Sequence, residues 1–133
     1  MTWPRNFSLA EFACKCGCQM SEKVELNCRA VAWSLQRMLR DPLQTRVKII
    51  SGYRCPDHNR AVKGKPLSRH LTGEAADIKV WGDGEWLPGE WVRGWIEAYL
   101  RLDGDDGCGI GTYVDKPHTV HYDIRGARAR WRE

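Results

Sequence analysis

Two long stretches of the chain carry apolar residues at helical spacing. In the first, which begins near Ser21, the apolar positions fall three and four residues apart: Val24, Cys28, Val31, Leu35 and Met38. We expect this helix to end at Asp41-Pro42, because the residue before a proline avoids the α region. The second stripe consists of Trp91, Trp95, Ala98 and Leu102, and the Gly/Asp-rich residues 103–109 end that helix.

Two shorter helices carry their own start signals. Ser8 and Glu11 form the S-x-x-E pattern of a capping box, in which each side chain satisfies a backbone N–H near the helix start. The helix that begins there runs into CKCGC, residues 14–18, whose glycine and closely spaced cysteines predict a tight loop. Pro56 suits the first position of a helix that extends to Val62.

The remaining segments are typical of strands. Residues 47–53 are rich in β-formers, residues 75–80 alternate between apolar and polar, and two further strands follow at 110–114 and 120–124. Early helices followed by a small sheet indicate an α+β fold. We therefore predict one domain, residues 1–133, whose small antiparallel sheet is packed by helices.

Length and composition narrow the class of protein. A chain of 133 residues makes about one domain with a substantial core, and seven tryptophans indicate that it packs. It has no stretch of ~18 apolar residues, so we expect no membrane span. Residues 1–12 lack the apolar segment of a secretory signal peptide. The net charge of +4 favours an anionic partner, and leaves open nucleic acid, a membrane surface or an anionic polymer such as the cell wall.

Histidine and aspartate positions predict a metal site. His70 lies at the end of a loop, and Asp77 lies on the non-core face of the strand that follows. In the last clear strand, His121 and Asp123 share the face opposite the apolar one, where Asp123 can orient His121. If the two strands pair, Asp77 and His121 face each other, and His70 reaches them from the loop. Two imidazoles and a carboxylate can form the three-ligand set of a catalytic zinc, which keeps a fourth position for water.

The same residues resemble a known family. Residues 68–77 read S-x-H-x-x-G-x-A-x-D, which resembles the signature of the zinc D-Ala-D-Ala carboxypeptidase family. That family includes phage L-alanyl-D-glutamate endopeptidases, and its metal fold recurs in the Hedgehog signalling domain. SGYR at 51–54, H-x-D at 121–123 and the cysteine-containing segment 7–18 are similar to other segments of its small phage-type members. The likeness therefore covers nearly the whole chain.

The resemblance implies roles for individual residues. It implies one catalytic zinc ion held by His70, Asp77 and His121. It also implies that Arg54 binds the substrate carboxylate or the developing oxyanion, because a bidentate guanidinium suits both tasks. Ser68 is expected to shape the site, or to hydrogen-bond the substrate or Asp77.

The general base is where this sequence departs from the family pattern. Many members carry Glu or Asp three residues before the last ligand, and here that position is His118. A neutral histidine can accept a proton from water and pass it to the leaving amine, so we predict that His118 is the base. Asp115 and Asp123 are the alternatives, and Asp123 shares a strand face with His121.

The six cysteines could be zinc ligands, buried free thiols or members of disulfides. Cys14, Cys16 and Cys18 could bind a second, structural zinc together with Cys28, although their spacing differs from that of the usual C-x-x-C sites. Cys28 also lies on the apolar face of its helix, where a thiol packs as a small apolar group. Disulfides are the third possibility, and their connectivity cannot be read from the sequence.

These observations predict a zinc metallopeptidase that hydrolyses an amide bond in peptidoglycan stem peptides. It would be an L-Ala-D-Glu endopeptidase or a D-Ala-D-Ala carboxypeptidase, monomeric, with no nucleic-acid partner and no membrane span. Because no signal peptide is recognised, we expect synthesis in a host cytoplasm and holin-type release to the wall, as for a phage endolysin.

Two other classes of protein stay open. A non-catalytic zinc module of the same fold would keep the three ligands but would have no base near the metal. A nucleic-acid-binding protein would use the basic residues 126–133 and the tryptophans, and its affinity would fall steeply with salt. That second class leaves the His/Asp pattern without an explanation.

Overall fold

A twisted sheet forms the centre of the molecule in a computed structural model, which describes residues 2–133. The spatial order of the strands is β1 (Arg46–Ser51), β2 (Ala75–Gly82), β5 (Lys116–Asp123), β4 (Gly109–Tyr113) and β6 (Ala129–Arg132). Neighbouring strands are antiparallel except for β4 and β6, which are parallel. A two-residue strand, β3 (Glu85–Trp86), pairs with the far end of β2. The predicted α+β class is confirmed, with a sheet that is mostly rather than wholly antiparallel.

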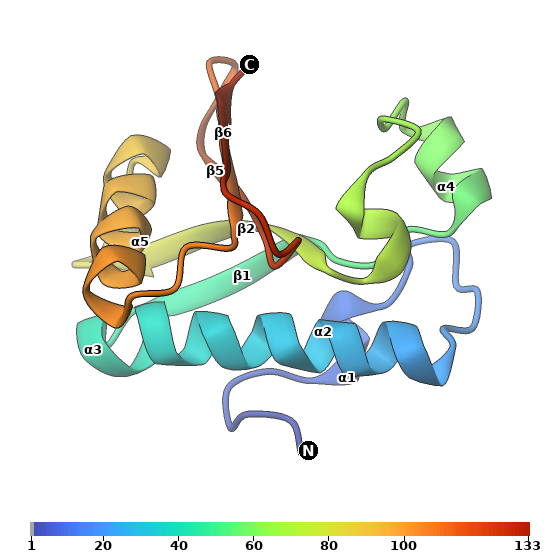
Figure 1. The fold of residues 1–133 in the computed structure, drawn as a ribbon, viewed down its shortest axis with the longest axis horizontal. Helices are drawn as coiled ribbons and strands as arrows, with labels where there is room; N and C mark the ends of the chain where they lie inside the picture. Colours follow the sequence, from blue (N-terminus) through green and yellow to red (C-terminus); the bar gives the residue numbers. More distant parts are fainter. Residues whose placement is uncertain (1) are drawn as a thin grey trace.

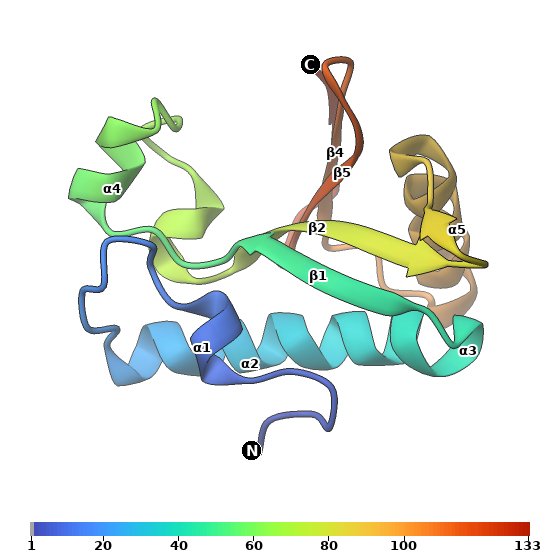
Figure 2. The same ribbon diagram turned by 180° about the vertical axis from the view of Figure 1, so that it is seen from behind.

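The helices cover one face and both ends of this sheet. α1 (Leu9–Phe12) and α2 (Glu22–Leu35) lie beneath β1 and β2 in both views (Figures 1 and 2). α5 (Gly89–Asp103) stands at one end of the molecule, and α4 (Pro56–Ala61) stands at the other, next to the short 3-10 helix η2 (Arg69–Thr72). Within residues 2–133, no helix has the length and apolar composition that a bilayer crossing requires.

The core lies between α2, α5 and the apolar face of the sheet. Its members are the alternate residues of β2 and β5 and the inward stripes of the two helices: Val31, Leu35, Ile78, Val80, Ile96, Val120 and Tyr122. Cys28 belongs to this core and is fully buried, as its place on the apolar helix face suggested. It is not part of the cluster that contains Cys14, Cys16 and Cys18, so the zinc site with Cys28 as fourth ligand, one of the possibilities left open by the sequence, is wrong.

The first long helix does not end at Asp41-Pro42, contrary to the prediction. It continues through a π-helical turn, η1 (Gln36–Arg40), and α3 (Asp41–Leu43), and ends where Gln44 adopts a φ of 55°. Proline has no backbone N–H, so it cannot donate a hydrogen bond to the carbonyl oxygen four residues before it. That carbonyl belongs to Met38, and it accepts instead from the indole N–H of Trp95 at 2.7 Å. The wider π turn and this outside donor let the helix pass through the proline.

The buried face of α5 is offset from the stripe that the sequence suggested. Val92, Ile96 and Leu100 point into the core, whereas Trp91 is 48% exposed and Leu102 is 91% exposed. The pattern was misleading because Arg93 is buried as well. Its guanidinium donates to the carbonyl oxygen of Trp131 at 2.8 Å and to Glu97 at 2.8 Å, so a charged residue occupies an inward position.

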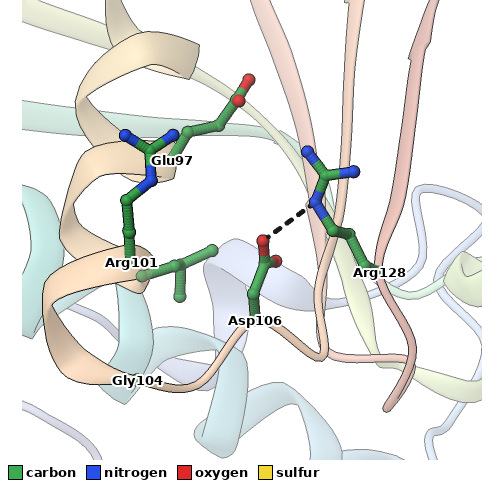
Figure 3. Close-up of a pocket in the computed structure, with 6 residues that line it drawn as sticks. Glu97, Arg101, Gly104, Asp106 and Arg128 are labelled. Carbon is green, nitrogen blue, oxygen red and sulfur yellow. Dashed lines mark hydrogen bonds and ion pairs between the residues drawn. The ribbon is translucent and has the colours of Figure 1, made fainter.

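The basic C-terminal segment is a strand rather than a free tail. β6 pairs with β4 from Gly109↔Ala129 to Thr112↔Arg132. The guanidinium of Arg130 donates to both oxygens of Asp106 at 2.6 and 2.7 Å, and Arg128 contacts the same carboxylate at 3.1 Å. Figure 3 shows Asp106 and Arg128 facing each other beside the end of α5. Carboxylates of this chain therefore already neutralise part of the predicted basic tail.

The offset of α5 can be tested by comparing two truncations. Ile96→Ala removes a fully buried side chain, and we expect it to lower the free energy of unfolding by about 2–5 kcal/mol. Leu102→Ala removes an exposed side chain of the sequence-derived stripe, so we expect a change of only about 0.5 kcal/mol. Urea denaturation of both variants provides the measurement. A larger loss for Leu102→Ala than for Ile96→Ala would contradict the observed face.

Candidate metal centre

The pairing of β2 with β5 brings two of the predicted ligands together. Asp77 and His121 are direct partners in the antiparallel register, and both point to the face opposite the core. His70 belongs to η2, which lies just before β2 and is capped by Ser68, whose hydroxyl accepts from the backbone N–H of His70 at 3.2 Å. The structure therefore juxtaposes the three residues in the way the sequence predicted.

The ring of His70 is fixed in one tautomer. Its Nδ1 lies 2.6 Å from the carbonyl oxygen of Gly52. A carbonyl can only accept, so Nδ1 carries the hydrogen and Nε2 keeps its lone pair. Within residues 2–133, Nε2 is buried without a hydrogen-bond partner, although Oδ1 of Asp77 lies 3.3 Å away. A bare ring nitrogen in the interior is costly unless a cation meets it.

His121 is oriented by a carboxylate behind it. Its Nε2 lies 2.7 Å from Oδ2 of Asp123, and its Nδ1 lies 3.2 Å from Oδ1 of Asp77. Burial on its own would lower the pKa of His121, but the two carboxylates raise it above its usual value. An Nε2–H donated to Asp123 leaves the Nδ1 lone pair directed at Asp77. A carboxylate behind the ring is the usual second partner of a metal-binding histidine.

Three electron-pair donors thus converge on one point. His70, Asp77 and His121 each offer one ligand atom, and these three atoms all lie within 4.8 Å of one another. Both nitrogen–oxygen separations, 3.3 and 3.2 Å, match the ~3.3 Å edge of a tetrahedron whose ligands lie ~2.0–2.1 Å from zinc. Burial would raise the pKa of Asp77, but the nearby imidazoles of His121 and His70 hold it well below its usual range. The residues fit a zinc ion.

Arg54 lies beside the carboxylate at the edge of this group. Its Nη2 is 3.7 Å from Oδ2 of Asp77, and its Nη1 donates to Oδ1 of Asn59 at 3.1 Å. Its backbone N–H donates to the carbonyl oxygen of His70 at 3.0 Å, which ties it to η2. The side chain of Arg54 lines the cavity in front of the three ligand residues. A mostly buried cation in this position can meet negative charge on a bound molecule.

Two cavities of similar volume, about 400 and 390 Å³, meet at Asp77. The first contains His70, His121, Arg54 and Ser68 and continues to the C-terminal strands. The second is lined by Asp115 and His118, two of the three residues considered as the general base. Asp77, Tyr113 and Lys116 line both cavities. His118 and Asp77 therefore line the same cavity, although His118 is not among the converging ligand residues of the described chain.

Asp123 has no oxygen left for proton transfer. It is fully buried, and its carboxylate accepts from His121 Nε2, from the backbone N–H of Gly109 at 3.1 Å and from Arg125 at 2.8 and 2.6 Å. Burial would raise the pKa of Asp123, but Arg125 and His121 hold it well below its usual range. This geometry suits a residue that positions His121, and does not suit a general base.

Two aromatic residues of the site were missed in the sequence. Tyr113 lies on β4, two residues beyond Gly111, which is the partner of His121, so alternation along the strand could have placed it on the metal face. Trp131 lies on β6 with its ring centroid 4.9 Å from that of His121. No side chain larger than hydrogen fits at Gly111, since a Cβ there would lie 2.2 Å from Nε1 of Trp131. Only the parallel pairing of β6 reveals the second contact.

The role of Asp123 can be tested through metal affinity. Asp123→Asn keeps the shape of the side chain but removes the charge that orients His121, so we expect zinc affinity to fall about 10–100-fold. Competition with a chromophoric chelator measures the affinity, and circular dichroism verifies the fold. A variant that folds and binds zinc as tightly as the wild type would exclude the positioning role.

Comparison with known proteins agrees with this geometry. No individual curated protein matches the chain. A family model described as Peptidase M15 matches residues 5–123, a range that includes the three ligand residues and ends at Asp123. Residues 124–133, with β6 and Trp131, lie beyond the match. The match spans most of the sequence, and the chain belongs to the Peptidase M15 family.

Proposed function

We propose that this protein is a zinc-dependent peptidoglycan endopeptidase that hydrolyses an amide bond within the stem peptides. The single observation that supports it best is the convergence of His70 Nε2, Asp77 Oδ1 and His121 Nδ1 at the spacing of zinc ligands. Membership of the Peptidase M15 family implies a metallopeptidase. Zinc bound at this point supplies a Lewis acid that polarises a carbonyl and acidifies water.

The two cavities favour an internal bond over a terminal one. Asp77 lines both of them and their volumes are nearly equal, so a peptide has room to extend from the metal into either cavity. A carboxypeptidase needs room for only one residue beyond the bond that it cuts. Cleavage of a terminal D-Ala is therefore the second candidate.

His118 is the residue we propose for proton transfer. Its Nδ1 lies 3.2 Å from the carbonyl oxygen of Leu87, which can only accept, so Nδ1 carries the hydrogen. Nε2 of the neutral ring then keeps a lone pair that can take a proton from water and return it to the leaving amine. Its place in the cavity next to Asp77 supports this role, and Asp115 in the same cavity is the alternative.

Arg54 and Tyr113 are suited to stabilise the charge that develops on the carbonyl oxygen. Arg54 brings a fixed positive charge to the cavity wall. Burial raises the pKa of Tyr113, and the charge of Asp77 raises it further, so its phenol stays protonated and can donate a hydrogen bond. Ser68 supports the site indirectly, because its hydroxyl holds the backbone of His70.

The pairing of basic residues weakens the nucleic-acid alternative. Arg128 and Arg130 contact Asp106, and Arg132 contacts Glu90 at 2.9 Å, so these cations of β6 are matched within the chain. A non-catalytic zinc module remains the stronger rival, because it would use the same three ligands. Action on the wall after release from a host cytoplasm stays a prediction of the sequence.

Peptidoglycan hydrolysis provides the direct test. We expect the protein with zinc to release new amino groups from purified peptidoglycan, chelation to abolish this release and added zinc to restore it. His70→Ala should stay inactive with zinc present, because one of three ligands is lost. Mass spectrometry of the products separates a new internal amino terminus from free D-Ala. If no amino groups appear under any metal condition, the peptidase proposal fails and the non-catalytic module is favoured.

The general base can be tested separately from the metal. His118→Gln keeps a donor for the Leu87 carbonyl but cannot carry a proton at neutral pH, so we expect kcat to fall about 10²–10⁴-fold. Bound zinc should stay unchanged in this variant, as measured by elemental analysis. Asp115→Asn is the matched control from the same cavity and should retain activity. If Asp115→Asn loses activity and His118→Gln does not, Asp115 is the general base.

A further inference from the structure

Four cysteines from separate parts of the sequence form a second cluster. Cys14, Cys16 and Cys18 belong to the loop after α1, and Cys55 is the N-cap residue of α4. Their sulfur atoms all lie within 4.8 Å of one another. The Sγ separations are 3.3 Å between Cys14 and Cys16 and 3.5 Å between Cys16 and Cys55, well beyond the ~2.05 Å of a disulfide bond. All six cysteines of the described chain are free.

Backbone N–H groups point at three of these sulfurs. The N–H of Cys55 donates to Sγ of Cys14, that of Cys18 to Sγ of Cys16, and that of His58 to Sγ of Cys55, each at 3.4 Å. The turn between Cys16 and Cys18 depends on Gly17, whose φ of 82° is rare for other residues. Donors aimed at sulfur stabilise thiolates more than thiols, because hydrogen bonds to charged acceptors are stronger. These three donors suit sulfur atoms that bind a cation as thiolates.

The four sulfurs lie too close together for all of them to carry negative charge unless a cation lies between them. Thiolates that bind a metal lose their protons, and a divalent cation at the centre compensates their charge.

We propose that Cys14, Cys16, Cys18 and Cys55 bind a structural zinc ion, separate from the catalytic one. Four thiolates leave no position for water, which is the arrangement of a structural rather than a catalytic site. With zinc–sulfur bonds of ~2.3 Å, a tetrahedron has edges of ~3.8 Å, and the observed separations need shifts of only a few tenths of an ångström. Tetrahedral sulfur ligands select zinc or iron over harder cations.

The position of the ion in the chain explains what it stabilises. The loop that carries Cys14, Cys16 and Cys18 has no helix or strand of its own between α1 and α2. Zinc would join this loop to Cys55, the residue next to Arg54, and so fix the start of α4. This inference does not depend on peptidase activity, because the four sulfurs are distinct from the ligand atoms of the first centre.

Metal content and cobalt spectroscopy test the second site on the chain of residues 1–133. We expect two zinc ions per chain for the wild type, and one for the double variant His70→Ala/Asp77→Ala. With cobalt(II) in place of zinc, that same variant should show the intense sulfur-to-metal charge-transfer absorption of a thiolate site. The double variant Cys16→Ser/Cys18→Ser changes two exposed residues, and should lose one zinc and the absorption.

Cys108→Ser is the matched control. Cys108 is buried outside the cluster, with its Sγ 3.4 Å from the hydroxyl of Tyr122, a contact that serine can keep. It should retain two zinc ions. The proposal is overturned if His70→Ala/Asp77→Ala binds no metal, if its cobalt form lacks the charge-transfer absorption, or if the bound metal is iron. It is also overturned if thiol alkylation shows disulfides that only a reductant opens. The measurement on His70→Ala/Asp77→Ala requires no cysteine substitution, so it decides the question even if the serine variants do not fold.

Discussion

The register between β2 and β5 is the constraint on which the candidate active site depends. It sets Asp77 opposite His121 and Ala75 opposite Asp123. A slip of one residue would turn every side chain of a strand to the other face, so Asp77 would enter the core and Ile78 would face solvent. The apolar residues Ile78, Val80, Val120 and Tyr122 prevent this slip because they are buried on the opposite face. The core therefore fixes the geometry of the polar site without contacting it.

Hydrogen bonds behind the ligands then determine which atoms are available. The carbonyl of Gly52 and the carboxylate of Asp123 each take the hydrogen of one ring nitrogen, and the other nitrogen of each histidine faces Asp77. Arg125 in turn compensates the charge of Asp123, which is fully buried. A buried carboxylate without such a partner would be strongly destabilising. The site is thus a group of lone pairs directed at one point and held there by the acceptors behind the two histidines, and this arrangement suits a cation.

The cysteine cluster offers softer ligands, and here the neighbouring groups are donors. Backbone N–H groups supply the donors, and sulfur atoms replace nitrogen and oxygen. The short segment 54–55 connects the two clusters, because Arg54 lines the cavity in front of the first and Cys55 belongs to the second. The loop that carries three of the sulfurs has no helix or strand of its own, and a second ion would hold it in place.

The sequence by itself determined the fold class, the strands that carry the ligands and the set His70, Asp77 and His121, because alternation along a strand and a distinctive spacing are local properties. Tertiary structure decided what depends on contacts between distant segments. It replaced Cys28 with Cys55, since helix geometry buries the first and a turn brings in the second. The long helix continues past Pro42 because the indole N–H of Trp95 donates to the Met38 carbonyl, which the proline leaves without a donor. The basic C-terminal residues form a strand because they pair with β4. Tertiary structure also saturated Asp123 with donors from Gly109 and Arg125. No local pattern encodes such partners, because each becomes a neighbour only when the chain packs.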